Sequence, residues 1–175
     1  PGAAPACRAE GLNVSLPTER LAAEWLEADG LGGFASGTVA GWRTRRYHGL
    51  LTPAVVPPSG RAVLVDGFEA WIERDGIRIP LSSQRYLPDV TYPDGTSRIV
   101  SFTHTPWPTW TFRLNDGLEV VQELLAIHER SVVMVRWSLP RPVSGLRLIV
   151  RPLLSGRDSH ALHYQNGDAR TAAES

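Results

Sequence analysis

The stretch from Glu24 to Leu51 reads EWLEADGLGGFASGTVAGWRTRRYHGLL and combines features that rarely occur together. Six of its 28 residues are glycine, and Arg45, Arg46, Tyr47 and His48 follow one another near its end. Glycine allows positive φ and close approach of backbones. A plain surface loop would not need the large apolar residues that stand among these glycines. We therefore expect a backbone folded tightly against the core, with the four consecutive side chains along one exposed ridge.

Short apolar runs and turn sequences alternate in the rest of the chain. The runs cover 47–54, 61–65, 68–74, 97–103, 107–114, 118–128, 131–139 and 146–154. Asp75-Gly76, Pro93-Asp94-Gly95 and Asn115-Asp116-Gly117 separate some of them, and such sequences are typical of hairpins and turns. This pattern predicts antiparallel strands packed as two sheets. Residues 118–127 could also form a helix, but the hairpins on both sides favour a strand.

The N-terminal part of the chain is harder to interpret. Residues 1–17 are rich in proline, alanine and glycine, so we expect a disordered or weakly ordered tail before a domain that covers 18–175. Thr18 could cap a helix, because Leu21, Trp25 and Leu26 follow at helical spacing. Helix and strand both remain open for 18–28.

Composition argues against several classes of partner. The chain has 175 residues, enough for one domain, and its formal net charge is zero. All 18 basic residues are scattered arginines, whereas nucleic-acid binding usually needs a basic face. No apolar run approaches the roughly 20 residues that cross a membrane. Cys7 is the one cysteine, which fits a reducing compartment, and we expect a cytoplasmic protein.

A family resemblance rests on long stretches of sequence. The string EWL…DGLGGFASGTVAG…TRRYHGLL resembles the N-terminal domain of bacterial and archaeal glycogen debranching enzymes of the amylo-α-1,6-glucosidase type. PPSGRAVLVDGFEAWI, TPWPTWTF and RPLLSGRDSH resemble the same family, so the resemblance covers about Glu24 to Gln165. It implies an all-β antiparallel sandwich of the supersandwich kind, and it favours a strand at Glu24–Leu26.

The resemblance also implies partners. The family's N-terminal domain continues with more strands and is followed by a C-terminal (α/α)6 catalytic barrel that acts on α-glucan, glycogen or maltooligosaccharide. We therefore expect the sandwich to be incomplete at its C-terminal end, where residues 165–175 show no strand or cap signal.

No residue of this chain is assigned to catalysis. Cleavage of a glycosidic bond usually needs two positioned carboxyl groups, and the resemblance places these in the barrel. Glu24, Glu27 and Asp29 cluster near the glycine-rich stretch, but loop capping or solvated charge is the commoner role for such residues. His160 and His163 have a spacing that a metal could use, but no third ligand is in view. We expect neither a metal nor a cofactor.

Two groups of residues are candidates for binding sugar. Arg45, Arg46, Tyr47 and His48 offer directed hydrogen-bond donors and an aromatic ring. Their structural alternative is an arginine pair that bridges acidic residues of a neighbouring strand or domain. If the segment is a strand, alternate side chains face opposite ways, and only one pair can line a pocket.

The second group is Arg157, Asp158 and His160, where the run 146–154 is expected to give way to a loop. Loops are common places for functional groups. Ser159 stands where the resembled family often has an aromatic residue. The structural alternative is that Asp158 caps a turn and pairs with Arg157.

Trp107 and Trp110 could stack on sugar, but large aromatic residues at strand ends more often complete a core.

The leading hypothesis is a non-catalytic domain that packs on the barrel and shapes its glucan-binding cleft. Two alternatives remain. The first is a free-standing carbohydrate-binding module. The second is a structural β-domain that mediates oligomer contacts, which would expose an apolar patch.

Overall fold

The computed structural model describes residues 15–56 and 60–162. The expectations for Cys7, His163, most of the N-terminal tail and residues 165–175 fall outside this part. The described chain is an antiparallel β-sandwich, as predicted, with one short α-helix, α1 (Thr18–Leu21), and one 3-10 turn, η1 (Thr96–Arg98). In the described residues, no helix has the length and apolar character needed to span a bilayer.

The larger sheet carries the glycine-rich stretch. Its strands are β1 (Glu24–Ala28), β2 (Phe34–Thr38), β3 (Gly49–Thr52), β4 (Ala54–Val56), β5 (Gly60–Arg74), β6 (Ile77–Pro80) and β13 (Leu146–Asp158). The main order is β1-β2-β3-β5-β13, and β4 and β6 also pair with β5. The first and last of these strands therefore lie at opposite ends of the same sheet, and β13 runs antiparallel along most of β5.

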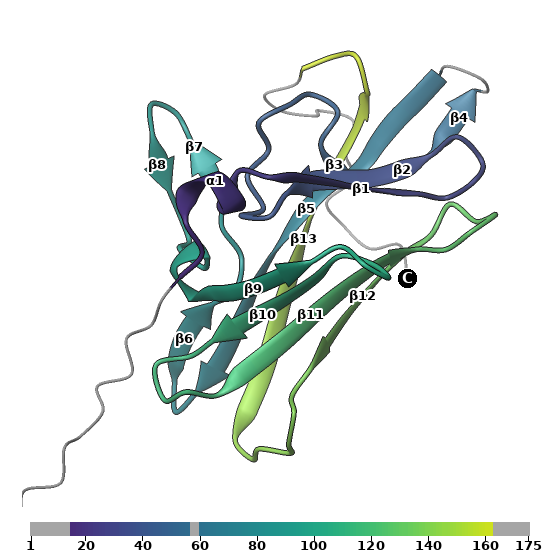
Figure 1. The fold of residues 1–175 in the computed structure, drawn as a ribbon. Helices are drawn as coiled ribbons and strands as arrows, with labels where there is room; N and C mark the ends of the chain where they lie inside the picture. Colours follow the sequence, from purple (N-terminus) through teal and green to yellow (C-terminus); the bar gives the residue numbers. More distant parts are fainter. Residues whose placement is uncertain (1–14, 57–59, 163–175) are drawn as a thin grey trace, which may run out of the picture.

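The smaller sheet has the order β12-β11-β10-β9. Its strands are β9 (Ile99–Thr103), β10 (Thr109–Arg113), β11 (Glu119–Ala126) and β12 (Val133–Ser138). Figure 1 shows these strands in front of β5 and β13. A separate hairpin of β7 (Arg85–Tyr86) and β8 (Val90–Thr91) projects from the body.

The core lies between the two sheets. Trp110 is 4% exposed, its ring meets Trp25 edge-to-face at 5.5 Å between centroids, and its indole N–H donates to the carbonyl of Val39 over 2.8 Å. Along β11, buried residues strictly alternate with half-buried ones, and Val120 and Leu124 are each 1% exposed. This period of two is that of a strand, so the strand interpretation of 118–127 is confirmed.

Local turn chemistry explains the hairpins. Asp75 and Gly76 both have positive φ (51° and 75°), which is the backbone of the tight turn that joins twisted strands such as β5 and β6. Gly117, at φ 81°, closes the β10–β11 hairpin, where the N–H of Leu114 donates to the carbonyl of Leu118 over 2.8 Å.

One expected break does not exist. The sequence predicted separate strands at 61–65 and 68–74, but β5 runs without interruption from Gly60 to Arg74. The strand passes through Asp66-Gly67 with an irregularity in its pairing to β13 near Leu153 and Leu154. A side chain on Gly67 would collide with the guanidinium of Arg43, so glycine here makes room for a crossing arginine rather than for a turn.

Both interpretations of 18–28 hold in part. A single helical turn, α1, precedes β1. Thr18 does not cap it: Pro17 occupies the N-cap position, and no side chain bonds to the helix start. Leu16 also packs against the core and donates its N–H to the carbonyl of Ile99 over 3.0 Å.

Candidate functional site

The ridge Arg45–His48 is a turn between β2 and β3, not a strand. The N–H of His48 donates to the carbonyl of Arg45 over 3.0 Å, which closes the turn. The alternation of faces expected for a strand therefore does not apply. Arg45, Arg46 and Tyr47 are exposed, whereas His48 is 3% exposed. Three of the four predicted side chains thus reach solvent, and the fourth anchors them.

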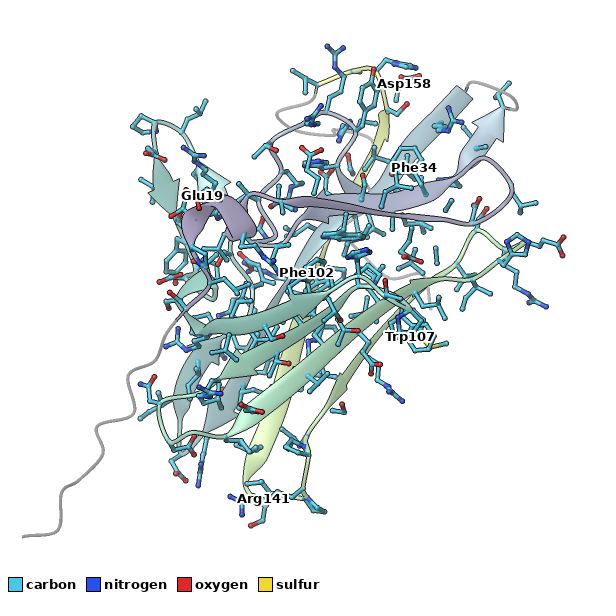
Figure 2. All side chains as sticks on the ribbon, viewed as in Figure 1. Glu19, Phe34, Phe102, Trp107, Arg141 and Asp158 are labelled. Atoms are coloured by element: carbon cyan, nitrogen blue, oxygen red, sulfur yellow. The ribbon has the colours of Figure 1, made fainter. Side chains whose placement is uncertain are left out.

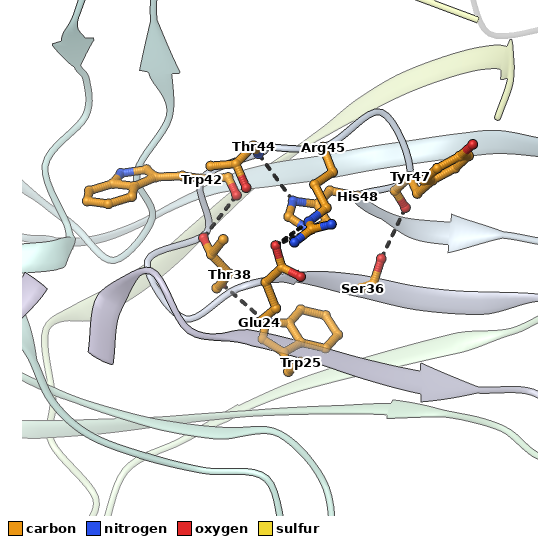
Figure 3. A network of polar contacts seen from close by, with 9 residues as sticks. All are labelled: Glu24, Trp25, Ser36, Thr38, Trp42, Thr44, Arg45, Tyr47 and His48. Carbon is orange, nitrogen blue, oxygen red and sulfur yellow. Dashed lines mark hydrogen bonds and ion pairs between the residues drawn. The ribbon is translucent and has the colours of Figure 1, made fainter. Parts of the chain in front are cut away.

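Glu24 on β1 holds this turn. Its Oε1 accepts from Arg45 Nε over 2.6 Å and lies 3.6 Å from His48 Nε2 (Figure 3). The N–H of Thr44 donates to His48 Nδ1 over 3.2 Å, which places the proton of a neutral imidazole on Nε2, toward Glu24. Burial lowers the pKa of His48, and the nearby carboxylate of Glu24 opposes that shift only in part.

Backbone contacts fix the same loop to β2. The hydroxyl of Ser36 donates to the carbonyl of Tyr47 over 3.0 Å, and that of Thr38 donates to the carbonyl of Trp42 over 2.9 Å. Backbone carbonyls in a tight loop need hydrogen-bond partners, and each hydroxyl supplies one. The exposed side chains therefore stand on a backbone tied down at both ends.

The second predicted group lies where β13 ends. Arg157 and Asp158 belong to the strand, which continues past the expected end at 154. The carboxylate of Asp158 accepts the N–H of His160 over 2.7 Å, so Asp158 does cap a turn. It does not pair with Arg157. That guanidinium is buried and contacts Asp66 instead, with Nη2 3.3 Å from Oδ1.

The two groups meet in space although more than 100 residues separate them. Arg46 Nη1 donates to the carbonyl of His160 over 3.1 Å, and the hydroxyl of Tyr47 lies 3.1 Å from His160 Nδ1. The rings of Tyr47 and His160 stand edge-to-face at 5.6 Å between centroids. Arg157 Nη2 donates to the carbonyl of His48 over 3.4 Å. We call the seven residues the loop cluster: Arg45, Arg46, Tyr47, His48, Arg157, Asp158 and His160.

Sequence reasoning missed a polar group next to the loop cluster. Arg43 donates to Gln84 Oε1, and Gln84 Nε2 donates to the carbonyl of Phe68 over 3.2 Å. With Asp66, these side chains line a cavity of about 70 Å³ between the sheets. Sites for small molecules usually measure about 300–1,000 Å³. The cavity is therefore too small for a sugar ring, and a sugar at the loop cluster would lie on its exposed side.

Two of the three acidic residues near the glycine-rich stretch, Glu24 and Asp29, have structural partners. Asp29 is buried, and its Oδ1 accepts the N–H groups of Leu31 and Gly33 over 2.7 and 2.9 Å. Partial burial raises the pKa of Glu27. Across the described ranges, no three histidine, cysteine, aspartate or glutamate side chains gather in a group that could hold a metal ion.

The two candidate tryptophans have different environments. Trp110 is part of the core, as its size suggested. Trp107 is half-buried at the surface, and its indole N–H donates to Glu123 Oε1 over 3.1 Å.

Comparisons with known proteins agree with the resemblance in the sequence. The family model described as "Glycogen debranching enzyme N terminal" matches residues 23–175. Searches of curated proteins and of solved structures returned no significant match. The matched range includes both sheets and the whole loop cluster. The chain belongs to the family of N-terminal domains of glycogen debranching enzymes.

Proposed function

We propose that this domain is the non-catalytic part of a cytoplasmic α-1,6-glucosidase, and that it packs on a C-terminal (α/α)6 catalytic barrel. In this proposal the loop cluster forms one wall of the glucan-binding cleft. The observation that carries the proposal is the meeting of Arg46 and Tyr47 with His160 on an exposed surface.

The chemistry of the exposed side chains suits a sugar. Beyond the bond to His160, the guanidinium of Arg46 makes no further hydrogen bond within the described residues, so donors remain for sugar hydroxyls. Arg46 also lies 5.7 Å from the centroid of the Tyr47 ring, which is 41% exposed as a residue. A ring and a planar donor held side by side are a common combination for a neutral polyol.

Arg45 has a different role in this proposal. It forms an ion pair with Glu24, as the structural alternative supposed, and thereby holds the turn rather than the ligand. His48, Arg157 and Asp158 likewise position the loops. Direct contact with glucan is assigned to Arg46, Tyr47 and His160.

The test uses the whole debranching enzyme that carries this domain. Arg46→Ala and Tyr47→Ala should each raise KM for a branched maltooligosaccharide about tenfold while changing kcat less, because they remove binding contacts rather than reacting groups. Arg141→Ala is the matched control, since Arg141 is an exposed arginine at the far end of the molecule (Figure 2). Unchanged KM values in both variants would contradict the assigned contacts.

A second measurement addresses the absence of catalysis. The isolated chain should show no turnover of a branch-point substrate, and clear turnover by a clean preparation would refute the proposal.

A further inference from the structure

The outer face of the smaller sheet has no covering element within the described residues. Figure 1 shows no helix or strand in front of β9–β12. The register places Thr103, Thr109, Glu123 and Arg136 in one row across the four strands. Leu125 and Met134 form the next row. We call this surface, together with Trp107 at its end, the Trp107 face: Thr103, Trp107, Thr109, Glu123, Leu125, Met134 and Arg136.

Trp107 is held in one orientation on this face. Its indole N–H donates to Glu123 Oε1 over 3.1 Å, and its carbonyl accepts from the hydroxyl of Thr109 over 3.0 Å. The other carboxylate oxygen of Glu123 accepts from Arg136 Nε over 2.7 Å. Both oxygens of Glu123 are therefore engaged, and rotation of the indole would break a bond. A half-buried ring fixed in this way loses little conformational freedom when it binds a ligand.

The charges of this face cancel. Arg136 pairs with Glu123, and Arg113 pairs with Glu119 on the same side of the sheet. Between these pairs stand three hydroxyl-bearing residues and one short apolar residue: Ser101, Thr111, Ser138 and Val121. A face with paired charges, hydroxyls and one fixed indole matches a neutral polyhydroxyl ligand. It does not match a polyanion, which would need unpaired cations.

We infer that the Trp107 face is a second binding surface for α-glucan, separate from the loop cluster. Trp107 stacks on the apolar side of one glucose ring, and the threonine and serine hydroxyls meet the hydroxyls of neighbouring rings. The choice of α-glucan as the ligand rests on the proposed function. Figure 2 shows Trp107 well away from Asp158 of the loop cluster, so one polymer particle could contact both surfaces while a short oligosaccharide contacts one.

The experiment measures co-sedimentation of the full chain with glycogen. Trp107→Ala should raise the apparent dissociation constant at least about tenfold, because a fixed aromatic anchor contributes a large share of such an interface. Trp107→Phe keeps a stacking ring and should retain most of the affinity. Tyr92→Ala is the matched control: Tyr92 is a 68% exposed aromatic residue that follows β8, away from this sheet, and its loss should change nothing.

Thermal unfolding of each variant shows whether the fold is kept. If Trp107→Ala fails to fold, Met134→Asp supplies the answer, because it places a charge at a 55% exposed position of the same face and should also weaken glycogen binding. Wild-type affinity in a folded Trp107→Ala, or loss of affinity in Tyr92→Ala alone, would overturn the inference. Its failure differs from failure of the proposed function. If only the inference fails, Trp107→Ala leaves the affinity for glycogen unchanged while Arg46→Ala still raises KM. If the proposed function fails, Arg46→Ala leaves KM unchanged.

Discussion

The guanidinium of Arg157 donates a hydrogen bond to the backbone carbonyl of His48, although 109 residues separate the two in the chain. The same guanidinium donates to the carbonyl of Ala161 over 3.2 Å and to Asp66 Oδ1 over 3.3 Å. One buried side chain thus joins the β2–β3 loop, the middle of β5 and the turn after β13. The relative position of the two loops that carry the loop cluster depends on it.

Replacement of Arg157 by methionine should therefore lower the free energy of unfolding by about 2–3 kcal/mol, because a charged hydrogen-bonding group is lost and its partners remain. Arg157→Lys should cost less, since it keeps the charge but not the planar fork. Urea denaturation measures both. The control is Arg78→Met, which removes an exposed ion pair with Glu73 and should cost less than about 1 kcal/mol. Equal losses at the two positions would contradict the joining role of Arg157.

The buried imidazole of His48 predicts a dependence of stability on pH. Burial lowers its pKa in the folded protein, whereas the unfolded value is about 6.5. The unfolded state therefore takes up the proton first as pH falls. The stabilisation present above about pH 6.5 should be lost as pH falls toward the lower folded value.

Thermal midpoints measured between pH 8 and pH 5 should fall with acidification in the wild type and less steeply in His48→Gln, which can still accept the N–H of Thr44. Carboxylates titrate at lower pH. Hydrogen bonds from Arg78 and Arg147 lower the pKa of Glu73, and the stabilisation from such groups is lost only as pH falls below their unfolded pKa values of about 4. Parallel pH profiles for wild type and His48→Gln would show that another group is responsible.

Sequence reasoning predicted correctly those turns whose conformation depends on neighbouring residues alone. Asp75, Gly76 and Gly117 all have positive φ, as Asp-Gly sequences favour in tight turns, so those hairpins could be predicted without knowledge of the fold. The expectation of separate strands at 61–65 and 68–74 was wrong, because Gly67 makes room for the distant side chain of Arg43 and the strand continues through it. The same limit applies to the loop cluster. The sequence identified seven residues in two groups, but neither their contact through His160 nor the burial of Arg157 follows from spacing.

A side chain at Gly33 should destabilise the β1–β2 connection. A Cβ atom there would collide with the carboxylate of Asp29 and lie 3.0 Å from both the carbonyl oxygen of Thr52 and the Cα of Pro53. Relief would move Asp29 away from the two N–H groups it binds. Gly33→Ala should cost about 1–3 kcal/mol by overpacking.

Urea denaturation of Gly33→Ala should be compared with that of Gly117→Ala. A Cβ at Gly117 would meet no atom within 4 Å, but its φ of 81° still strains an alanine. That backbone strain alone costs about 1–2 kcal/mol. The comparison separates collision from strain, and a double-mutant cycle with Asp29→Ala, which alone removes the acceptor of two N–H groups, identifies the obstacle. A loss in the double variant smaller than the sum of the two single losses would show that the carboxylate is the obstacle, whereas additive losses would point to the backbone of Thr52 and Pro53.

The outer edge of β13 should make the isolated chain self-associate. Within the described residues β13 pairs with β5 alone, and its exposed apolar side chains include Leu154 at 70% and Val150 at 40%. An open strand edge with apolar side chains is a template for pairing with another chain, and lysine at such an edge opposes it.

Sedimentation velocity should therefore show a mass that rises with concentration. The double variant Val150→Lys and Leu154→Lys should weaken association at least about tenfold. Leu87→Lys changes a leucine that is 90% exposed on the β7–β8 hairpin and serves as the control. If Leu87→Lys alone abolished association, the contact would run through the hairpin and not through the sheet edge.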